Sequence, residues 1–406
     1  MIVIVRPNAR IQYNKLEEIR AIEPPIWHTI LADYYKAKVI IDAELENYTI
    51  EETVEKILSY KPKKVIILAT GSHPSAFIQQ RDGMNKIEKL LGGNIETITL
   101  DHLPKSPVKY KAKYDLIDIE RYKCHNWHSW TNNCNVQPYG TIYTSISCPF
   151  KCEFCTIHQF YGRTFEQRPI EDVYKDLDYF AFHRIKNIKI MDELFIFNPN
   201  RAMLICDYII KKEYDFNIWA YARIDIMAPQ LLEKMRKAGI RWLAYGIETG
   251  NEQIRKNVLK GRFDNNKIRE VVKMTKDYDI AVLGNYMFGF WEDTIDTMQE
   301  TLDFALELQC EYNNLYCVVA YPDSLLYNSM KEKGVDLPVS WDEYGQFSKS
   351  FKPLPTKTLS GNKVLKFRDY AFNTLFNDPI YLSMMENKFG EDVLKDILKM
   401  TRIKIR

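Results

Sequence analysis

Short apolar runs and amphipathic segments alternate along the first hundred residues. Ile- and Val-rich runs indicate strands at 2–5, 38–42, 64–70 and 95–100, and helical patterns lie between them at 26–36, 50–60 and 82–91. Strands that alternate with helices pair in parallel and build an open α/β sheet. Residues 1–104 are therefore predicted to form a doubly wound, Rossmann-like parallel sheet, in which a ligand would lie at the carboxyl ends of the strands.

From residue 141 the pattern becomes six strand-then-helix units. The strands are predicted at 141–147, 187–191, 216–222, 241–247, 281–288 and 314–320. One intervening helix shows an apolar stripe at i, i+3, i+4, i+7 spacing, made by Ile170, Val173, Tyr174, Leu177 and Phe180. Six units predict a partial (β/α) barrel over residues 141–330, with its chemistry at the carboxyl ends of the strands.

Two further segments complete the predicted organisation. Residues 105–140 have little periodicity and are interpreted as a linker, and residues 331–406 as a helical C-terminal segment on the substrate side. Ser360 and Asp378-Pro379 are favourable helix starts within that segment.

The linker holds the possible metal ligands Cys124, His125, His128 and Cys134, but their spacing matches no standard zinc pattern. Aromatic packing over the barrel mouth is the expected role of the linker. The cysteines outside the linker and the loop described below, Cys206, Cys310 and Cys317, are expected in the core.

Composition limits the classes of partner. The chain has 406 residues, and its 56 Lys and Arg nearly balance its 54 Asp and Glu, which argues against a dedicated nucleic-acid ligand. No run of about 18 apolar residues occurs, and the first residues lack the features of a signal peptide, so neither a membrane span nor export is expected. Eight cysteines in a chain of this length do not suggest a disulfide framework, and a reducing cytoplasm is predicted.

The distinctive chemistry lies in Cys148, Cys152 and Cys155, spaced C-x3-C-x2-C directly after the strand at 141–147. A loop can wrap three thiolates around one inorganic centre, and thiolates select zinc or iron–sulfur clusters. A structural zinc site needs a fourth ligand, usually from a second cysteine pair, and no second C-x2-C pair is present. Three buried thiols without a metal remain the alternative to a 4Fe-4S cluster with one iron open.

This motif, with Phe154 before the third cysteine, closely resembles that of the radical S-adenosylmethionine (SAM) superfamily. The resemblance implies that the three cysteines are the metal ligands and the catalytic centre, and that the open iron chelates SAM. It also implies that reductive cleavage gives a 5′-deoxyadenosyl radical that takes hydrogen from a substrate, and that a flavodoxin or ferredoxin-type protein donates the electron. Phe154 is expected near the adenine.

The resemblance extends to the strand ends. It implies SAM contacts from Asp192 and Glu193 after the second strand, Arg223 after the third, Glu248 after the fourth, and Gly284, Met287, Gly289 and Glu292 around the fifth. Tyr321-Pro322 after the sixth is interpreted as an active-site turn. Singly, each charged residue is equally well explained as a solvated strand end or a structural ion pair.

The first 104 residues resemble the cobalamin-binding domain that precedes many radical SAM enzymes, in the stretches 22–27, 41–44 and 69–76. The last strand of such domains and their D-x-H-x-x-G motif are missing. Cobalamin binding is therefore left open, with weak binding or none expected and the domain acting as a lid on the barrel. His73 is either a ligand contact or a turn histidine.

Three functional hypotheses follow. The first is a radical SAM enzyme acting on a small-molecule or carbohydrate-like substrate, with methyl transfer to carbon if cobalamin binds. The second keeps the radical without cobalamin and gives epimerisation, dehydration or rearrangement. The third, a non-catalytic iron–sulfur protein for electron transfer or sensing, does not account for the set of polar strand ends.

Overall fold

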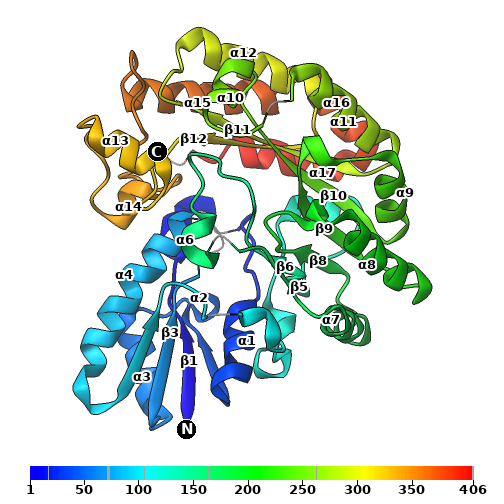
Figure 1. The fold of residues 1–406 in the computed structure, drawn as a ribbon. Helices are drawn as coiled ribbons and strands as arrows, with labels where there is room; N and C mark the ends of the chain where they lie inside the picture. Colours follow the sequence, from blue (N-terminus) through cyan, green and yellow to red (C-terminus); the bar gives the residue numbers. More distant parts are fainter. Residues whose placement is uncertain (17, 71–73, 105, 163, 262, 405–406) are drawn as a thin grey trace.

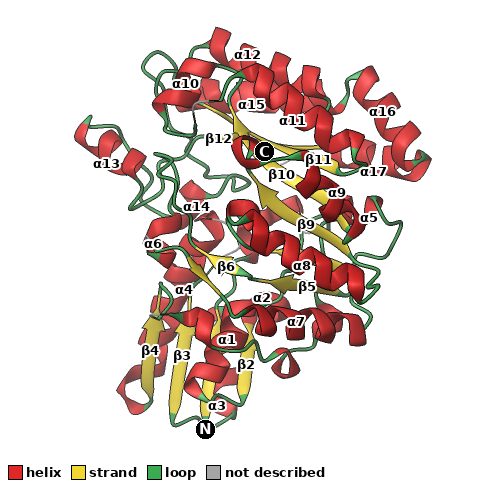
Figure 2. Ribbon diagram, turned by 45° about the vertical axis from the view of Figure 1, so that its right-hand side comes forward, coloured by secondary structure: helices red, strands yellow, loops and turns green. Residues whose placement is uncertain are grey.

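The computed structural model describes residues 1–406 except 17, 71–73, 105, 163, 262 and 405–406. Figure 1 shows a four-stranded sheet at the N-terminal end (blue), a larger sheet built from the middle of the chain (green to yellow), and C-terminal helices (orange and red) beyond it. Figure 2 shows the helices arranged on both sides of the small sheet and along the outside of the large one.

The small sheet is parallel throughout, as the strand and helix alternation predicts. Its strands are β1 (Ile2–Arg6), β2 (Val39–Asp42), β3 (Lys64–Leu68) and β4 (Glu96–Leu100), in the order β2-β1-β3-β4. The helices are α1 (Ile26–Tyr35), α2 (Ala43–Glu46), α3 (Ile50–Ser59) and α4 (Pro74–Leu91). Helix α4 begins eight residues before the predicted residue 82, because its first turns bury the polar Ser75, Gln79 and Gln80 rather than an apolar stripe.

The large sheet contains the six predicted parallel strands. They are β5 (Tyr139–Ile142), β8 (Asn187–Ile190), β9 (Asn217–Ala222), β10 (Ile240–Glu248), β11 (Ala281–Phe288) and β12 (Tyr312–Cys317), paired in sequence order. The outer helices are α7 (Ile170–Phe182), α8 (Pro199–Lys211), α9 (Pro229–Lys237), α10 (Glu252–Asn257), α11 (Asn265–Asp277) and α12 (Ile295–Leu308). Strands β5 and β12 are opposite edges of the sheet, so the barrel is partial.

The cysteine loop follows a short break in the first strand. After β5 the chain forms β6 (Ser145–Ile146), which pairs antiparallel with β7 (Glu166–Gln167), and the helix α6 (Ile157–Tyr161) closes the loop. The predicted strand 141–147 is thus two shorter pieces separated at Tyr143 and Thr144.

The predicted linker covers the amino-terminal end of the barrel strands, whereas its expected position was the carboxyl-terminal end, the barrel mouth. Helix α5 (Asn126–Trp130) places Trp127 against the rings of Trp219, Trp242 and Tyr312, with ring centroids 4.9–5.5 Å apart. These three aromatic residues lie toward the starts of their strands. The expectation of aromatic packing was correct, but its placement at the barrel mouth was wrong, since aromatic content does not specify which end a segment covers.

The linker cysteines and histidines form no metal group within the described residues. His128 Nε2 lies 2.9 Å from the carbonyl of Asn217, and Cys134 Sγ lies 3.0 Å from Asn187 Oδ1. These side chains pack at the amino-terminal end of the barrel strands. The core assignment of the other three cysteines is confirmed, because Cys206, Cys310 and Cys317 are fully buried.

The C-terminal helices are α13 (Leu325–Glu332), α14 (Trp341–Tyr344), α15 (Gly361–Phe376), α16 (Pro379–Phe389) and α17 (Glu391–Thr401). Both predicted helix starts are observed, and the Asp378 side chain accepts a hydrogen bond from the Tyr381 amide at 2.8 Å. Helix α15 packs on β12 and α12, and so covers the open edge of the barrel. Among the described residues, no helix is both long and apolar enough to cross a membrane.

Candidate active site

A cavity of about 560 Å³ lies where the carboxyl ends of the barrel strands face the carboxyl edge of the small sheet. Its walls come from both sheets, since Thr70 and Asp101 after β3 and β4 line it together with Tyr321 after β12. This volume is within the range of small-molecule sites. The position agrees with the predicted location of chemistry in a (β/α) barrel.

All three motif cysteines line this cavity. Backbone hydrogen bonds tether the loop at its centre: the Glu153 amide donates to the Val258 carbonyl at 3.1 Å, and the Leu326 amide donates to the Glu153 carbonyl at 3.0 Å. His158 Nε2 lies 2.6 Å from the Cys148 carbonyl. The loop is therefore held by α10, by the start of α13 and by its own closing helix.

The thiols are electrostatic neighbours. Burial raises the pKa of the Cys148 thiol, and the nearby Cys152 raises it further. No three His, Cys, Asp or Glu side chains in the described part of the chain converge as one metal ion requires. An iron–sulfur cluster binds each thiolate to a different iron, so three thiols that line one cavity fit such a cluster.

Asp192 is not among the residues that line the cavity. Its carboxylate is fully buried and accepts hydrogen bonds of 2.6 Å from the Thr144 amide, the Thr144 hydroxyl and the Ser145 hydroxyl. These contacts connect Asp192 to the break between β5 and β6 that leads into the cysteine loop. The strand-end position was visible in the sequence, but the direction of the side chain was not.

Glu193 does line the cavity, beside Tyr143 and Tyr161. Burial raises the pKa of this carboxyl well above its ordinary value, and the Asp192 charge contributes to the rise. Its Oε2 atom is buried without a hydrogen-bond partner within the described residues. Such an acceptor suits a ligand ammonium group, as the resemblance implies.

Arg223 lines the cavity between the loop and β10. Its guanidinium binds the Asp225 carboxylate at 2.8 and 2.9 Å, donates to the Lys260 carbonyl at 2.8 Å, and lies 3.6 Å from the ring centroid of Phe150. Glu248 also lines the cavity and pairs with the Lys260 ammonium at 2.7 Å. The polar wall thus consists of paired charges rather than isolated ones.

Strand β11 contributes fewer predicted residues than expected. Met287 lines the cavity and packs in the same apolar cluster as Phe154, which also lines it. Gly284 lies on the other face of the strand, where an added Cβ would meet the Tyr286 ring at 2.7 Å. Alternation along the strand explains this difference, because residues 285 and 287 face inward and residue 284 does not.

The last two predicted contacts also lie outside the cavity lining. Gly289 has a left-handed backbone with φ of 95° and approaches Val364 of α15. Glu292 is exposed and is paired with Asn257 and Lys357. Both residues shape the turn after β11 and its contacts with neighbouring segments.

Several cavity residues were not predicted from the sequence. The unpredicted residues from the barrel interior are Lys189, Tyr221, Asn285 and Tyr316, and Lys260 follows α10. Lys189 carried a signal that was overlooked, since a charged residue inside the fully buried strand Asn187–Ile190 requires a partner. That partner is Glu23, whose Oε1 lies 2.5 Å from Lys189 Nζ.

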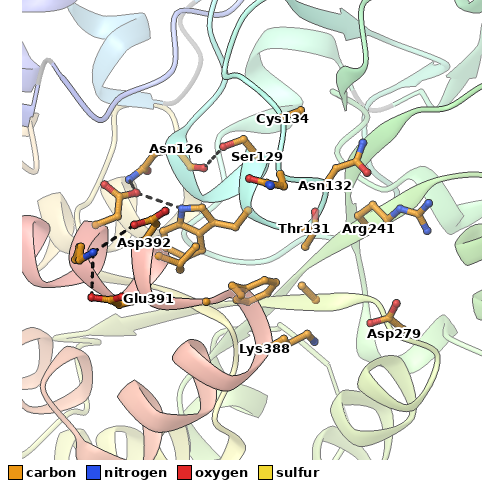
Figure 3. A pocket seen from close by; sticks show the side chains of 18 of the residues that line it. Asn126, Ser129, Thr131, Asn132, Cys134, Arg241, Asp279, Lys388, Glu391 and Asp392 are labelled. Atoms are coloured by element: carbon orange, nitrogen blue, oxygen red, sulfur yellow. Dashed lines mark hydrogen bonds and ion pairs between the residues drawn. The ribbon is translucent and has the colours of Figure 1, made fainter.

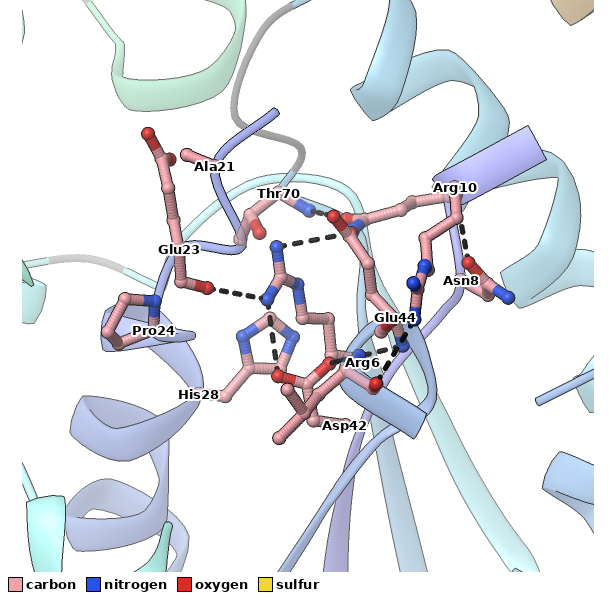
Figure 4. Close-up of polar contacts among 12 residues, drawn as sticks. Arg6, Asn8, Arg10, Ala21, Glu23, Pro24, His28, Asp42, Glu44 and Thr70 are labelled. Carbon is pink, nitrogen blue, oxygen red and sulfur yellow. Dashed lines mark hydrogen bonds and ion pairs between the residues drawn. The ribbon is translucent and has the colours of Figure 1, made fainter. Parts of the chain in front are cut away.

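The small sheet reverses its strand order between β1 and β3, which is where a ligand of such a sheet would bind. Figure 4 shows this edge filled by side chains. Arg6 at the end of β1 pairs with Asp42 at 3.2 Å and with Glu44 at 3.1 Å, and donates to the Glu23 carbonyl at 2.8 Å. All four residues are more than nine-tenths buried.

Further contacts complete this network. Gln80 Nε2 donates to Glu44 at 2.8 Å, the Thr70 amide donates to Gln80 Oε1 at 3.0 Å, and Tyr122 donates to Asp42 at 2.9 Å. The stretches that resemble a cobalamin site are therefore bonded to one another. The network occupies the edge beside β1 and β2, whereas Thr70, Asp101 and His102 at the ends of β3 and β4 line the 560 Å³ cavity. His73 lies outside the described residues.

A second and larger cavity, of about 970 Å³, lies at the other end of the barrel, between α5 and α17 (Figure 3). Asp396 accepts hydrogen bonds there from Asn126 at 2.7 Å and from Trp130 at 3.2 Å. Arg236 pairs with Asp279, and Lys395 pairs with Glu391. Because this cavity lies away from the cysteine loop, size alone does not make it the active site.

A parallel partial barrel with a three-cysteine loop at its carboxyl end defines a class of cluster-binding proteins. Residues 142–305 match the family described as the Radical SAM superfamily. Residues 142–305 of the chain are therefore a radical SAM domain.

Sequence relatives include an uncharacterized methyltransferase, PH0819, of Pyrococcus horikoshii, 26% identical over 57% of this chain and 48% of the relative. Another is the bacteriochlorophyllide d C-8(2)-methyltransferase of Chlorobaculum tepidum, 23% identical over 88% of this chain and 86% of the relative. The chain spans about half the length of the first of these relatives.

Solved structures share the fold. The radical SAM methyltransferase TsrM of Kitasatospora setae, solved with cobalamin and a 4Fe-4S cluster, aligns with a TM-score of 0.66 at 11% identity, over 98% of this chain and 99% of TsrM. The cobalamin-dependent radical enzyme OxsB aligns with a TM-score of 0.55 at 16% identity, over 82% of this chain and 55% of OxsB. At these identities the likeness establishes the fold alone.

Proposed function

We propose that this chain is a radical SAM enzyme that takes a hydrogen atom from a small-molecule substrate. When bound at the thiolates of the three motif cysteines, a 4Fe-4S cluster would supply the electron for reductive cleavage of SAM to a 5′-deoxyadenosyl radical. Cys148, Cys152 and Cys155 would hold that cluster. The observation that carries the proposal is that these thiols share one cavity with the polar ends of four barrel strands.

The remaining residues bind and orient SAM. Glu193, whose Oε2 lacks a partner within the described residues, would accept hydrogen bonds from the SAM ammonium. Arg223 and Glu248 stand on neighbouring strands, where they would meet the carboxylate and the ribose hydroxyls. Phe154 and Met287 offer an apolar surface for the adenine. Asp192, Gly284, Gly289 and Glu292 act through positioning of the loop and strands.

The N-terminal sheet would act as the lid of the barrel. Trp27 of α1 donates to the Tyr161 hydroxyl at 3.1 Å and lies 4.4 Å from the Tyr143 ring, and Ser75 lies 2.8 Å from the Tyr321 hydroxyl. These contacts join the lid to both sides of the cavity and would exclude water from the radical. We infer domain boundaries at residues 104, 140 and 330, supported by the two separate sheets.

The reaction that follows hydrogen abstraction depends on whether the chain binds cobalamin. Several relatives are named as methyltransferases, and methyl transfer to carbon is one candidate reaction. The buried network at the edge of the small sheet favours the cobalamin-independent branch, which comprises epimerisation, dehydration and rearrangement. A flavodoxin or ferredoxin-type protein would supply the electron.

The test is product analysis of SAM turnover. The cluster-loaded protein, reduced with dithionite in the absence of oxygen, should convert SAM to 5′-deoxyadenosine and methionine. Formation of S-adenosylhomocysteine alone, or no turnover by protein with a full cluster, would contradict the radical function and favour a carrier or sensor role.

A further inference from the structure

The cavity is also lined by polar residues inside the barrel strands, and one of them, Tyr316, pairs in register with Met287. Lys189 on β8, Tyr221 on β9 and Tyr316 on β12 line it. Lys189 and Tyr221 each lie two residues nearer the start of their strands than a cavity residue at the strand end, so they face the same way from a deeper position. We call these three residues the floor triad.

Lys189 is buried but only partly satisfied. It is 4% exposed, donates to Glu23 at 2.5 Å, and lies 4.6 Å from the ring centroid of Trp219 and 5.7 Å from that of Tyr221. An ammonium carries three N–H donors, and aromatic faces attract its charge without accepting a full hydrogen bond. Across the described residues Glu23 is its sole hydrogen-bond acceptor.

The two phenols also lack partners. Within the described residues, neither the Tyr221 hydroxyl nor the Tyr316 hydroxyl makes a hydrogen bond, and burial raises the pKa of both, so they remain protonated donors. Asn285, which lines the same cavity, contrasts with them: its amide donates to the Tyr245 carbonyl at 3.2 Å and accepts from Asn314 at 2.9 Å. Unused donors are therefore a property of the triad rather than of every polar residue in the cavity.

Charge balance limits the kinds of chemical group that the floor triad can bind. Glu23 already neutralises Lys189, so a carboxylate bound at the triad would place an uncompensated negative charge close to Glu23. Burying an unpaired charge is costly, whereas a neutral oxygen can accept hydrogen bonds without adding charge. We propose that the floor triad binds a neutral oxygen-bearing group of the substrate, a carbonyl or hydroxyl. This inference rests on the proposed function, because it assigns the deep part of the cavity to the substrate of the radical reaction.

A matched pair of probes tests this inference without knowledge of the substrate. Lactamide and lactate have the same shape and differ in charge, and saturation transfer to their methyl protons reports binding to the cluster- and SAM-loaded protein. We expect lactamide to give a larger signal than lactate. The double variant Tyr221→Phe/Tyr316→Phe, which loses two unpartnered hydroxyls, should reduce the lactamide signal several-fold at unchanged iron content.

Tyr370→Phe, which removes a hydroxyl from a side chain that is 53% exposed, is the matched control and should leave the signal unchanged. A lactate signal equal to or above that of lactamide, an absent lactamide signal, or one that survives the double variant would overturn the inference. Because the readout is binding, failure of this inference can be distinguished from failure of the proposed function. Formation of 5′-deoxyadenosine without triad-dependent binding of lactamide would refute only the role of the floor triad. Lactamide binding without SAM cleavage refutes the radical function alone.

Discussion

Arg223 and Glu292 are both predicted from the sequence as SAM contacts, but only Arg223 lines the cavity. Arg223 lies between the cysteine loop and Glu248 in the cavity lining, whereas Glu292 is exposed and lies outside that lining. Loss of a charge-assisted hydrogen bond costs about 1.5–3 kcal/mol. Arg223→Met should weaken SAM binding roughly ten- to a hundredfold, with near-normal iron content, while Glu292→Ala serves as the control and leaves the affinity unchanged. Equilibrium dialysis with labelled SAM measures both, and the reverse ranking would contradict the site.

The buried pair of Glu23 and Lys189 should make stability depend on pH. Burial alone would raise the pKa of Glu23, but the Lys189 ammonium outweighs it and holds the pKa below the ordinary value of 4.5. Stability from a carboxyl with a depressed pKa is present above its unfolded pKa and is lost as pH falls through the folded one. At neutral pH, Glu23→Gln should therefore destabilise the chain by about 3–5 kcal/mol.

Urea unfolding at a series of pH values tests this linkage. The gap in unfolding free energy between the parent and Glu23→Gln should close below pH 4.5 as the parent carboxyl becomes protonated. The same change at an exposed carboxylate, Glu292→Gln, should give a small gap with no such closure. A gap for Glu23→Gln that stays constant across the range would exclude a charged pair.

At the scale of elements, the break between β5 and β6 controls the cysteine loop. Asp192 accepts three hydrogen bonds from Thr144 and Ser145 there. Asp192→Ala would leave those buried donors unsatisfied, at about 1–3 kcal/mol each. We expect less iron per chain and a lower Tm, but near-parent SAM affinity in the fraction that retains the cluster. Full iron content at parent Tm would show that the break needs no such support.

Element types and their order were predictable because each strand and helix carries its own hydrophobic period. The six barrel strands and the helix starts at Ser360 and Asp378 follow from local pattern. The direction of a strand-end side chain does not, since one residue of register reverses it. The sequence therefore did not show that Gly284 and Asp192 lie outside the cavity lining. Lys189 was missed because its partner Glu23 lies 166 residues away in sequence.

At the scale of the whole molecule, we propose that the small sheet acts as a lid whose edge beside β1 is filled by its own side chains. The network of Arg6, Asp42 and Glu44 fills this edge beside β1, and on that ground we expect no stable binding of cobalamin. Hydroxocobalamin mixed with the cluster-loaded chain should separate from it on gel filtration, leaving no corrinoid in the visible spectrum of the protein. Stoichiometric retention would overturn the lid assignment and make methyl transfer from cobalamin the working mechanism.

The central claim is that the three-cysteine loop holds a cluster that cleaves SAM. Iron content and 5′-deoxyadenosine formation, measured without oxygen on the parent and on the Cys148→Ala/Cys152→Ala/Cys155→Ala triple variant, test it directly. The parent should carry about four irons per chain and cleave SAM, and the triple variant should lose both properties while keeping its fold. A triple variant that cleaves SAM at the parent rate would contradict the account.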